Sequence, residues 1–186
     1  MRADAALTPL LACPVGAIAA VLPGEADPIW SASQLRQGRY PVHRTTRSIL
    51  FKWLESLTPS GPQPVLSADD LPEPLVAAVS ECASTIAQHY GGTVVRLLLV
   101  ELPAGGQITA HRDSGHLLSN THRCHLPVVT NPQVRFTIDG DVFHLETGMV
   151  YGMDNMRLHS VENGGPTRRV HLVCNILPPE GARALA

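Results

Sequence analysis

Histidine is the residue type most concentrated in one part of this sequence. The chain has 186 residues and nine histidines. Because a neutral imidazole is the commonest metal ligand and an imidazole titrates near neutral pH, such a cluster indicates metal binding or acid–base chemistry. Seven of the nine lie between residues 111 and 171: His111, His116, His122, His125, His144, His159 and His171.

One tripeptide inside this cluster has the spacing of two metal ligands. His111 and Asp113 flank Arg112. If the segment is a β-strand, residues i and i+2 point to the same face, so the imidazole and the carboxylate share a face and Arg112 points away. We expect His159 to supply a third ligand from a facing strand. Two histidines and one carboxylate with open coordination positions suit a non-haem Fe(II) that activates oxygen.

Two arginine–histidine pairs repeat the same spacing further along the chain. Arg123 and His125 form one pair, and Arg169 and His171 form the other. Each pair shares one face of its predicted strand, while Arg168 is expected to be exposed. An unpaired guanidinium in a core would be costly, so a carboxylate ligand would account for these arginines.

The elements that must position these residues are short strands. Asp139-Gly140 between two apolar runs predicts a tight hairpin. Short strands at regular spacing are typical of a jelly roll or β-sandwich, so we predict a mainly β fold with flanking helices. The predicted strands cover residues 94–102, 107–113, 123–129, 134–138, 142–145, 149–153, 158–161 and 169–176.

The first half of the chain has a mixed pattern and one clear helix. Apolar residues recur at helical spacing over residues 75–90, with Asp69 or Asp70 as the cap and Gly91 at the end. The apolar N-terminal stretch is interpreted as part of the mature fold. We treat residues 1–186 as a single domain, in which residues 1–92 support the fold and shape the substrate side, and residues 93–178 form the β core.

Composition excludes several classes of protein. Fourteen basic and sixteen acidic residues give a net charge of −2, which does not favour nucleic-acid binding. The chain is 44% hydrophobic, too much for wholesale disorder, and no apolar run approaches the roughly 20 residues of a membrane span. The four cysteines form no CxxC pair and are expected to be buried, reduced thiols in a cytoplasmic protein.

The segments that carry these residues, taken together, resemble the aspartyl/asparaginyl β-hydroxylase branch of the Fe(II)- and 2-oxoglutarate-dependent oxygenases. The resemblance extends over residues 94–177, roughly half of the chain. The order and spacing of the segments are more specific than any one of them. The segments are Gly106–Asp113, Arg123–Val128, Val142–Leu145 with Gly148, Met153–Ser160 and Arg169–Leu172.

The resemblance implies a fold, a set of cofactors and a reaction. The fold is a double-stranded β-helix of the cupin-like, jelly-roll type. The reaction uses Fe(II), 2-oxoglutarate and O₂ to hydroxylate an unactivated C–H bond, and it releases succinate and carbon dioxide. The best-known peptidyl members lack an acidic residue where Asp113 stands, whereas this chain has the full triad. The implied roles are iron binding by His111, Asp113 and His159, anchoring of the distal carboxylate of 2-oxoglutarate by Arg169, and support of the co-substrate by Arg123 and His125.

The substrate is less constrained by the sequence. The family implies the β-carbon of an Asp or Asn, in a peptide or as a free amino acid. Candidate substrate-binding residues are Arg96, His43, Arg47 and Asn120. Two alternatives to substrate binding remain open. A structural ion pair would account for the presence of Arg96 equally well, and residues 42–47 could simply form a solvated loop. No oligomeric state is predicted.

Two other functions fit part of the pattern. A non-catalytic, cupin-like protein that binds a metal or a carboxylate would keep the histidines but would not need Arg169 beside a chelating co-substrate. A zinc-dependent hydrolase or isomerase would need a general base near the metal. No spare acidic residue is evident beside the predicted triad.

Overall fold

A computed structural model of the chain describes residues 5–54 and 71–179. The strands are β1 (Leu7–Ala12), β2 (Arg47–Trp53), β3 (Thr93–Leu102), β4 (Gln107–His111), β5 (His122–Val129), β6 (Val134–Ile138), β7 (Asp141–Phe143), β8 (Met149–Met153), β9 (His159–Asn163) and β10 (Arg169–Leu177). The α-helices are α1 (Gly16–Val21), α2 (Leu35–Arg39), α3 (Glu73–Tyr90) and α4 (His116–Ser119), and Pro28–Ser31 and Pro41–His43 form two 3₁₀ turns, η1 and η2.

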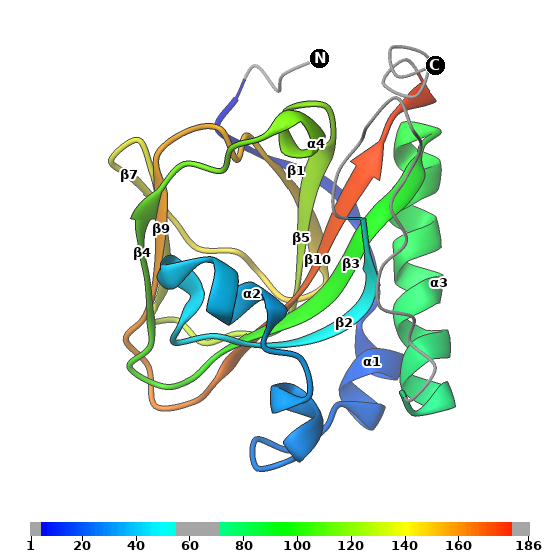
Figure 1. The fold of residues 1–186 in the computed structure, drawn as a ribbon, viewed down its shortest axis with the longest axis vertical. Helices are drawn as coiled ribbons and strands as arrows, with labels where there is room; N and C mark the ends of the chain where they lie inside the picture. Colours follow the sequence, from blue (N-terminus) through cyan, green and yellow to red (C-terminus); the bar gives the residue numbers. More distant parts are fainter. Residues whose placement is uncertain (1–4, 55–70, 180–186) are drawn as a thin grey trace.

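The strands form two antiparallel sheets (Figure 1). The larger sheet has the order β1-β8-β5-β10-β3-β2, and the smaller has the order β4-β9-β6-β7. From β3 to β10 the chain passes back and forth between the sheets, and only the β6–β7 hairpin stays in one sheet. The mainly β, jelly-roll fold predicted from the sequence is therefore confirmed.

Local sequence explains the tight connection between β6 and β7. Asp139 and Gly140 have φ angles of 50° and 97°. A two-residue hairpin of this kind needs positive φ at both central positions, which Asp and Gly tolerate best. This hairpin holds β6 in register beside β9, the strand that begins with His159.

Alternation along β10 divides polar from apolar side chains. Val170, Leu172 and Cys174 belong to the main hydrophobic core, together with the apolar side of α3. α3 covers the outer face of the larger sheet (Figure 1) and ends at Gly91, whose φ is 59°. The predicted helix is thus present, and the proposed caps Asp69 and Asp70 lie outside the described residues. No helix in the described ranges combines the length and apolarity that crossing a membrane requires.

The segment before residue 93 completes the fold at several points. β1 and β2 are the edge strands of the larger sheet, paired with β8 and β3. α2 and η2 lie over the space between the sheets (Figure 1), and Thr45 Oγ1 donates a hydrogen bond to the Gln107 carbonyl in β4. The apolar N-terminal stretch is therefore part of the fold.

A buried carboxylate connects several of these elements. Glu101 is fully buried and lies opposite Arg47 in the β2–β3 register, where the two side chains form an ion pair. Arg168 Nη1 contributes a second ion pair at 3.2 Å, and the Arg168 side chain is only 14% exposed. The expectation that Arg168 is exposed was wrong, because the buried Glu101 needs compensating positive charge. Arg168 Nη2 also donates to the Pro23 carbonyl at 2.9 Å.

Candidate functional site

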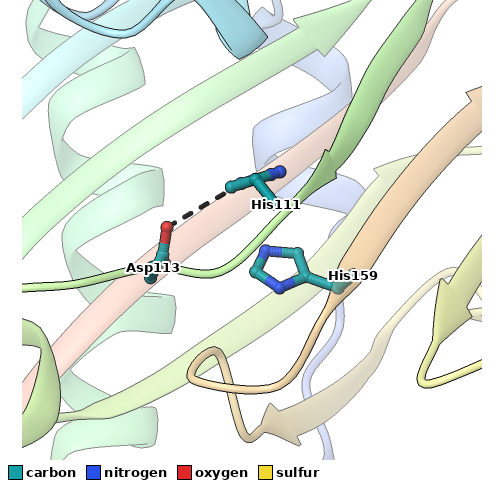
Figure 2. Close-up of side chains that lie close together, drawn as sticks. All are labelled: His111, Asp113 and His159. Atoms are coloured by element: carbon teal, nitrogen blue, oxygen red, sulfur yellow. Dashed lines mark ion pairs between the residues drawn. The ribbon is translucent and has the colours of Figure 1, made fainter.

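The predicted metal ligands lie together at one end of the smaller sheet (Figure 2). His111 is the last residue of β4, and His159 is the first residue of β9. The two are paired in register, so His159 comes from the neighbouring strand and not from a facing one as expected. Asp113 lies two residues beyond the end of β4, and its Oδ1 is 3.8 Å from His111 Nε2. The three ligand atoms all lie within 4.8 Å of one another, which is close enough to hold one metal ion.

Backbone carbonyls fix the orientation of both imidazoles. His111 Nδ1 is 2.8 Å from the Thr109 carbonyl, and His159 Nδ1 is 2.8 Å from the Arg157 carbonyl. A carbonyl only accepts hydrogen bonds, so Nδ1 of each ring carries the proton and Nε2 is left with a free lone pair. This outer hydrogen bond is the usual support of a metal-binding histidine.

Three hydrogen bonds hold the Asp113 carboxylate and its backbone. Asn155 Nδ2 and Arg123 Nη2 donate to Oδ2 at 3.0 and 2.9 Å, and the Asp113 N–H donates to the Asn155 carbonyl at 3.0 Å. Burial alone would raise the pKa of this carboxyl, but Arg123, Asn155 and the two histidines hold it well below its usual range. Asp113 is therefore an anion at neutral pH, as a cation ligand must be. The sequence placed Asn155 in the turn before His159, but its hydrogen bonds to Asp113 were not predicted, because they depend on how that turn folds against the end of β4.

Beside the triad lies a narrow inner cavity with an uncompensated positive charge. The cavity is about 30 Å³, and Arg169, His125 and Phe136 are among its lining residues. Arg169 is only 1% exposed, and its Nε and Nη2 have no hydrogen-bond partner among the described residues. Burial, followed by the charge of Arg36, lowers the pKa of Arg169 to about 9. A carboxylate ligand would supply the missing countercharge and the missing acceptors.

Two buried histidines extend this polar region. Neither ring nitrogen of His125 or of His171 has a hydrogen-bond partner within the described part of the chain. The His171 ring is stacked on Phe136, with the ring centroids 5.5 Å apart. Burial, followed by the charge of Arg169, holds the pKa of both histidines well below the usual range. Both rings are thus neutral at pH 7, and each retains one N–H that can donate to a ligand.

A larger outer cavity borders the triad at His111 and Asp113. Its volume is about 210 Å³, and it is lined by residues of the N-terminal segment as well as by β-strands. His111, Asp113 and Arg123 line both cavities. The candidate metal centre therefore borders two cavities, one narrow and one wider.

The structure separates the four predicted substrate-binding residues. His43 and Arg96 line the outer cavity. Arg47 does not: strand alternation places it on the outer face of the larger sheet, beside Glu101. Asn120 also lies outside the lining residues, and its Nδ2 donates to the His116 carbonyl at 2.7 Å.

Arg36 is the residue that sequence reasoning missed most clearly. It belongs to α2, is 8% exposed and lines both cavities. Its Nη2 lies 3.1 Å from His43 Nε2, and the His43 ring meets the His111 ring edge-on with centroids 5.4 Å apart. The sequence around Arg36 has no clear periodicity, so only the folded position of α2 identifies this residue.

Comparison with known protein families agrees with this geometry. Residues 73–179, which include every strand from β3 to β10, match the model of the family described as aspartyl/asparaginyl beta-hydroxylase. The chain belongs to this family. The predicted resemblance is therefore confirmed, and it supports a hydroxylase-like role for a site whose His-Asp-His group could bind a metal.

Solved structures show the fold that this aspartyl/asparaginyl β-hydroxylase family member shares with other proteins. An oxidoreductase of the 2OG-Fe(II) oxygenase family from Burkholderia pseudomallei is similar with a TM-score of 0.53 and 14% identity, over 71% of this chain and 66% of that protein. A cupin domain from Bordetella pertussis has 23% identity and a TM-score of 0.37, over 45% of this chain and 82% of that domain. This chain thus spans slightly less than two thirds of the Burkholderia protein.

Proposed function

We propose that this protein is an Fe(II)- and 2-oxoglutarate-dependent dioxygenase that hydroxylates an unactivated C–H bond. The proposed target is the β-carbon of an Asp or Asn, in a peptide or as a free amino acid. One observation carries the proposal. A buried arginine with no acidic partner among the described residues, Arg169, lies in the same small cavity as a two-histidine, one-carboxylate centre.

The residues present fit both absent groups. His111, Asp113 and His159 would hold Fe(II), because two imidazoles and one carboxylate are the donor set that this ion takes in oxygenases. Arg169 would hold the distal carboxylate of 2-oxoglutarate, whose two oxygens match the unpartnered guanidinium nitrogens. When bound, Fe(II) and 2-oxoglutarate supply the oxidative chemistry that consumes O₂ and gives succinate, carbon dioxide and a hydroxylated product.

The protein contributes position, charge and exclusion of water. Arg123 keeps Asp113 ionised from one side, and Asn155 holds the same oxygen from the other. His125 is available to donate to the co-substrate beside the metal. The His43 ring packs edge-on against His111, and Arg36 contacts His43, so these two side chains limit the access of water to His111. The outer cavity is the place proposed for the substrate, because it is the wider approach to the triad.

An assay of succinate formation tests the proposal. The purified protein, supplied with Fe(II), 2-oxoglutarate and O₂, is expected to form succinate, and a library of Asp- and Asn-containing compounds is expected to increase the rate. Asp113→Ala removes a ligand and is expected to abolish succinate formation, whereas the matched control Asp141→Asn changes an exposed acid in β7 and is expected to leave it unchanged.

Two results would contradict the proposal. Equal succinate formation by Asp113→Ala and the parent protein would show that the triad is not the reacting centre. Tight binding of Fe(II) and 2-oxoglutarate without any succinate would instead support a non-catalytic, cupin-like binding protein.

A further inference from the structure

The wall of the outer cavity is rich in arginine. Four arginines line it: Arg36, Arg96, Arg112 and Arg123. Asp113 is the single acidic residue in the lining formed by the described part of the chain, and Arg123 already pairs with it at 2.9 Å. Among the described residues, the cavity proposed for the substrate is therefore lined by more guanidinium groups than carboxylates.

Arg36 is the guanidinium whose position is hardest to explain by structure alone. It is more than nine-tenths buried, and its Nη1 has no hydrogen-bond partner within the described residues. Its Nη2 donates to His43 Nε2 at 3.1 Å, and an imidazole nitrogen that accepts a hydrogen bond supplies no negative charge. A buried guanidinium without a countercharge lowers stability, so such a group is retained where a ligand supplies the missing acceptor.

The location of Arg36 indicates which ligand this is. Arg36 lines both cavities, as do His111 and Asp113 of the triad, so its side chain borders the outer cavity and the metal centre together. Arg169, which lines the inner cavity but is not among the residues lining the outer one, is the residue already proposed for the distal carboxylate of the co-substrate. Arg96 lines the same outer cavity, and its guanidinium carbon lies 4.0 Å from the Trp53 ring centre, so the cavity wall also includes an aromatic ring.

We propose that Arg36 of α2 is a specificity-determining residue that binds a carboxylate of the substrate in the outer cavity. The proposal rests on the proposed function, because it takes the outer cavity as the substrate's place. It selects an acidic substrate, which carries a carboxylate near the oxidised carbon, over a neutral one of the same shape. It also gives α2 a function: substrate binding fixes this short helix over the triad.

A binding experiment without turnover tests this assignment. The protein is loaded anaerobically with Fe(II) and 2-oxoglutarate, and the dissociation constants of four probes are measured by calorimetry. The probes are l-aspartate, l-asparagine, N-acetyl-aspartate N-methylamide and N-acetyl-asparagine N-methylamide. Comparison of each aspartate probe with its asparagine counterpart isolates the side-chain carboxylate, and comparison of the free with the capped amino acid measures the joint contribution of the main-chain carboxylate and ammonium groups.

The parent protein is expected to bind at least one carboxylate-bearing probe more tightly than its neutral counterpart. Loss of a charge-assisted hydrogen bond typically weakens binding by about 10- to 100-fold, so Arg36→Gln is expected to reduce that preference by this factor. Arg36→Lys keeps the charge but loses the fork and is expected to retain part of the preference. The matched control Arg39→Gln removes the same charge from the exposed side of the same helix and is expected to change the preference by less than about two-fold.

Defined results would overturn the assignment. It is wrong if the parent protein shows no preference for any carboxylate, or if Arg36→Gln keeps the parent's preference. It is also wrong if Arg36→Gln weakens binding of 2-oxoglutarate and leaves the probe preference intact, because Arg36 would then serve the co-substrate. Succinate formation, measured in parallel in air, distinguishes failure of the proposed function from failure of the Arg36 assignment. If the parent protein forms no succinate, the proposed function is contradicted. If the parent is active but Arg36→Gln leaves its selectivity unchanged, only the role of Arg36 is contradicted.

Discussion

Asn155 shows how much of the candidate metal centre depends on residues that are not themselves ligands. Its side chain donates to Asp113 Oδ2, and its backbone carbonyl accepts from the Asp113 N–H. These two bonds fix both the carboxylate and the chain just beyond β4, where no strand pairing holds Asp113. A metal site needs such outer contacts, because a freely rotating carboxylate loses conformational entropy when it binds a cation.

Replacing Asn155 with alanine should therefore weaken metal binding without unfolding the protein. The backbone hydrogen bond to Asp113 persists, but the side-chain bond is lost, and we expect affinity for Fe(II) to fall by about 10- to 100-fold. Anaerobic calorimetry with Fe(II) measures this directly. The control is Asn120→Ala, whose side chain bonds within the α4 turn, and an equal effect of the two variants would contradict the role given to Asn155.

Arg169 is expected to determine the affinity for 2-oxoglutarate. Arg169→Gln should raise the KM for 2-oxoglutarate by about 10- to 100-fold, because it replaces a charged donor to a carboxylate with a neutral one. The same change removes a buried cation that lacks a countercharge in the described chain, so the ligand-free variant should unfold at the same temperature or a higher one than the parent. Arg135→Gln, on the exposed side of β6, is the control for kinetics and melting temperature. A lower melting temperature with an unchanged KM would show that Arg169 is structural.

At the scale of elements, strand alternation was the most informative signal in the sequence. A side-chain period of two holds in any sheet, so the shared face of Arg169 and His171 could be predicted without knowing the fold. Alternation does not say which strands are neighbours, which is why His159 was expected from a facing strand and lies beside His111 instead. Arg36 reaches the site through tertiary packing of a short helix, and no local pattern in the sequence encodes that contact.

The ion pairs of Glu101 connect β3 to β2 and to the residue just before β10. Glu101→Gln leaves Arg47 and Arg168 without their common partner, and we expect the free energy of unfolding to fall by about 2–3 kcal/mol. Urea unfolding measures the change. The control, Glu162→Gln, alters an exposed acid of β9, and a similar small effect of both variants would mean that the Glu101 ion pairs contribute little.

For the whole molecule, the polar interior makes stability depend on pH. His125 and His171 are buried without partners among the described residues, and their pKa values in the folded state lie well below the ordinary value. Below the ordinary histidine pKa, these two side chains are therefore protonated in the unfolded chain but stay neutral in the folded protein. Their contribution to stability is complete above the unfolded pKa of about 6.5 and is lost progressively as the pH falls below it.

Replacing His171 should make this pH dependence shallower. Each such histidine contributes up to about 1.4 kcal/mol per pH unit below the unfolded pKa, so His171→Leu should reduce the slope of unfolding free energy between pH 6.5 and 5 by about one proton. Urea unfolding of the metal-free protein at several pH values gives the slope. The control His89→Leu changes an exposed histidine of α3 and should leave the slope unaltered. An unchanged slope in His171→Leu would show that His171 takes up a proton in the folded protein as readily as in the unfolded chain.

For the whole molecule, we expect the triad and Arg169 to act as a single oxygen-dependent centre. Simultaneous measurement of O₂ consumed and succinate formed, with Fe(II), 2-oxoglutarate and a stimulating Asp- or Asn-containing compound, tests it most directly. We expect the amounts of O₂ consumed, succinate formed and hydroxylated product formed to be equal. All three should be lost in Asp113→Ala. Succinate formation without O₂ consumption, or O₂ consumption that persists in Asp113→Ala, would contradict it.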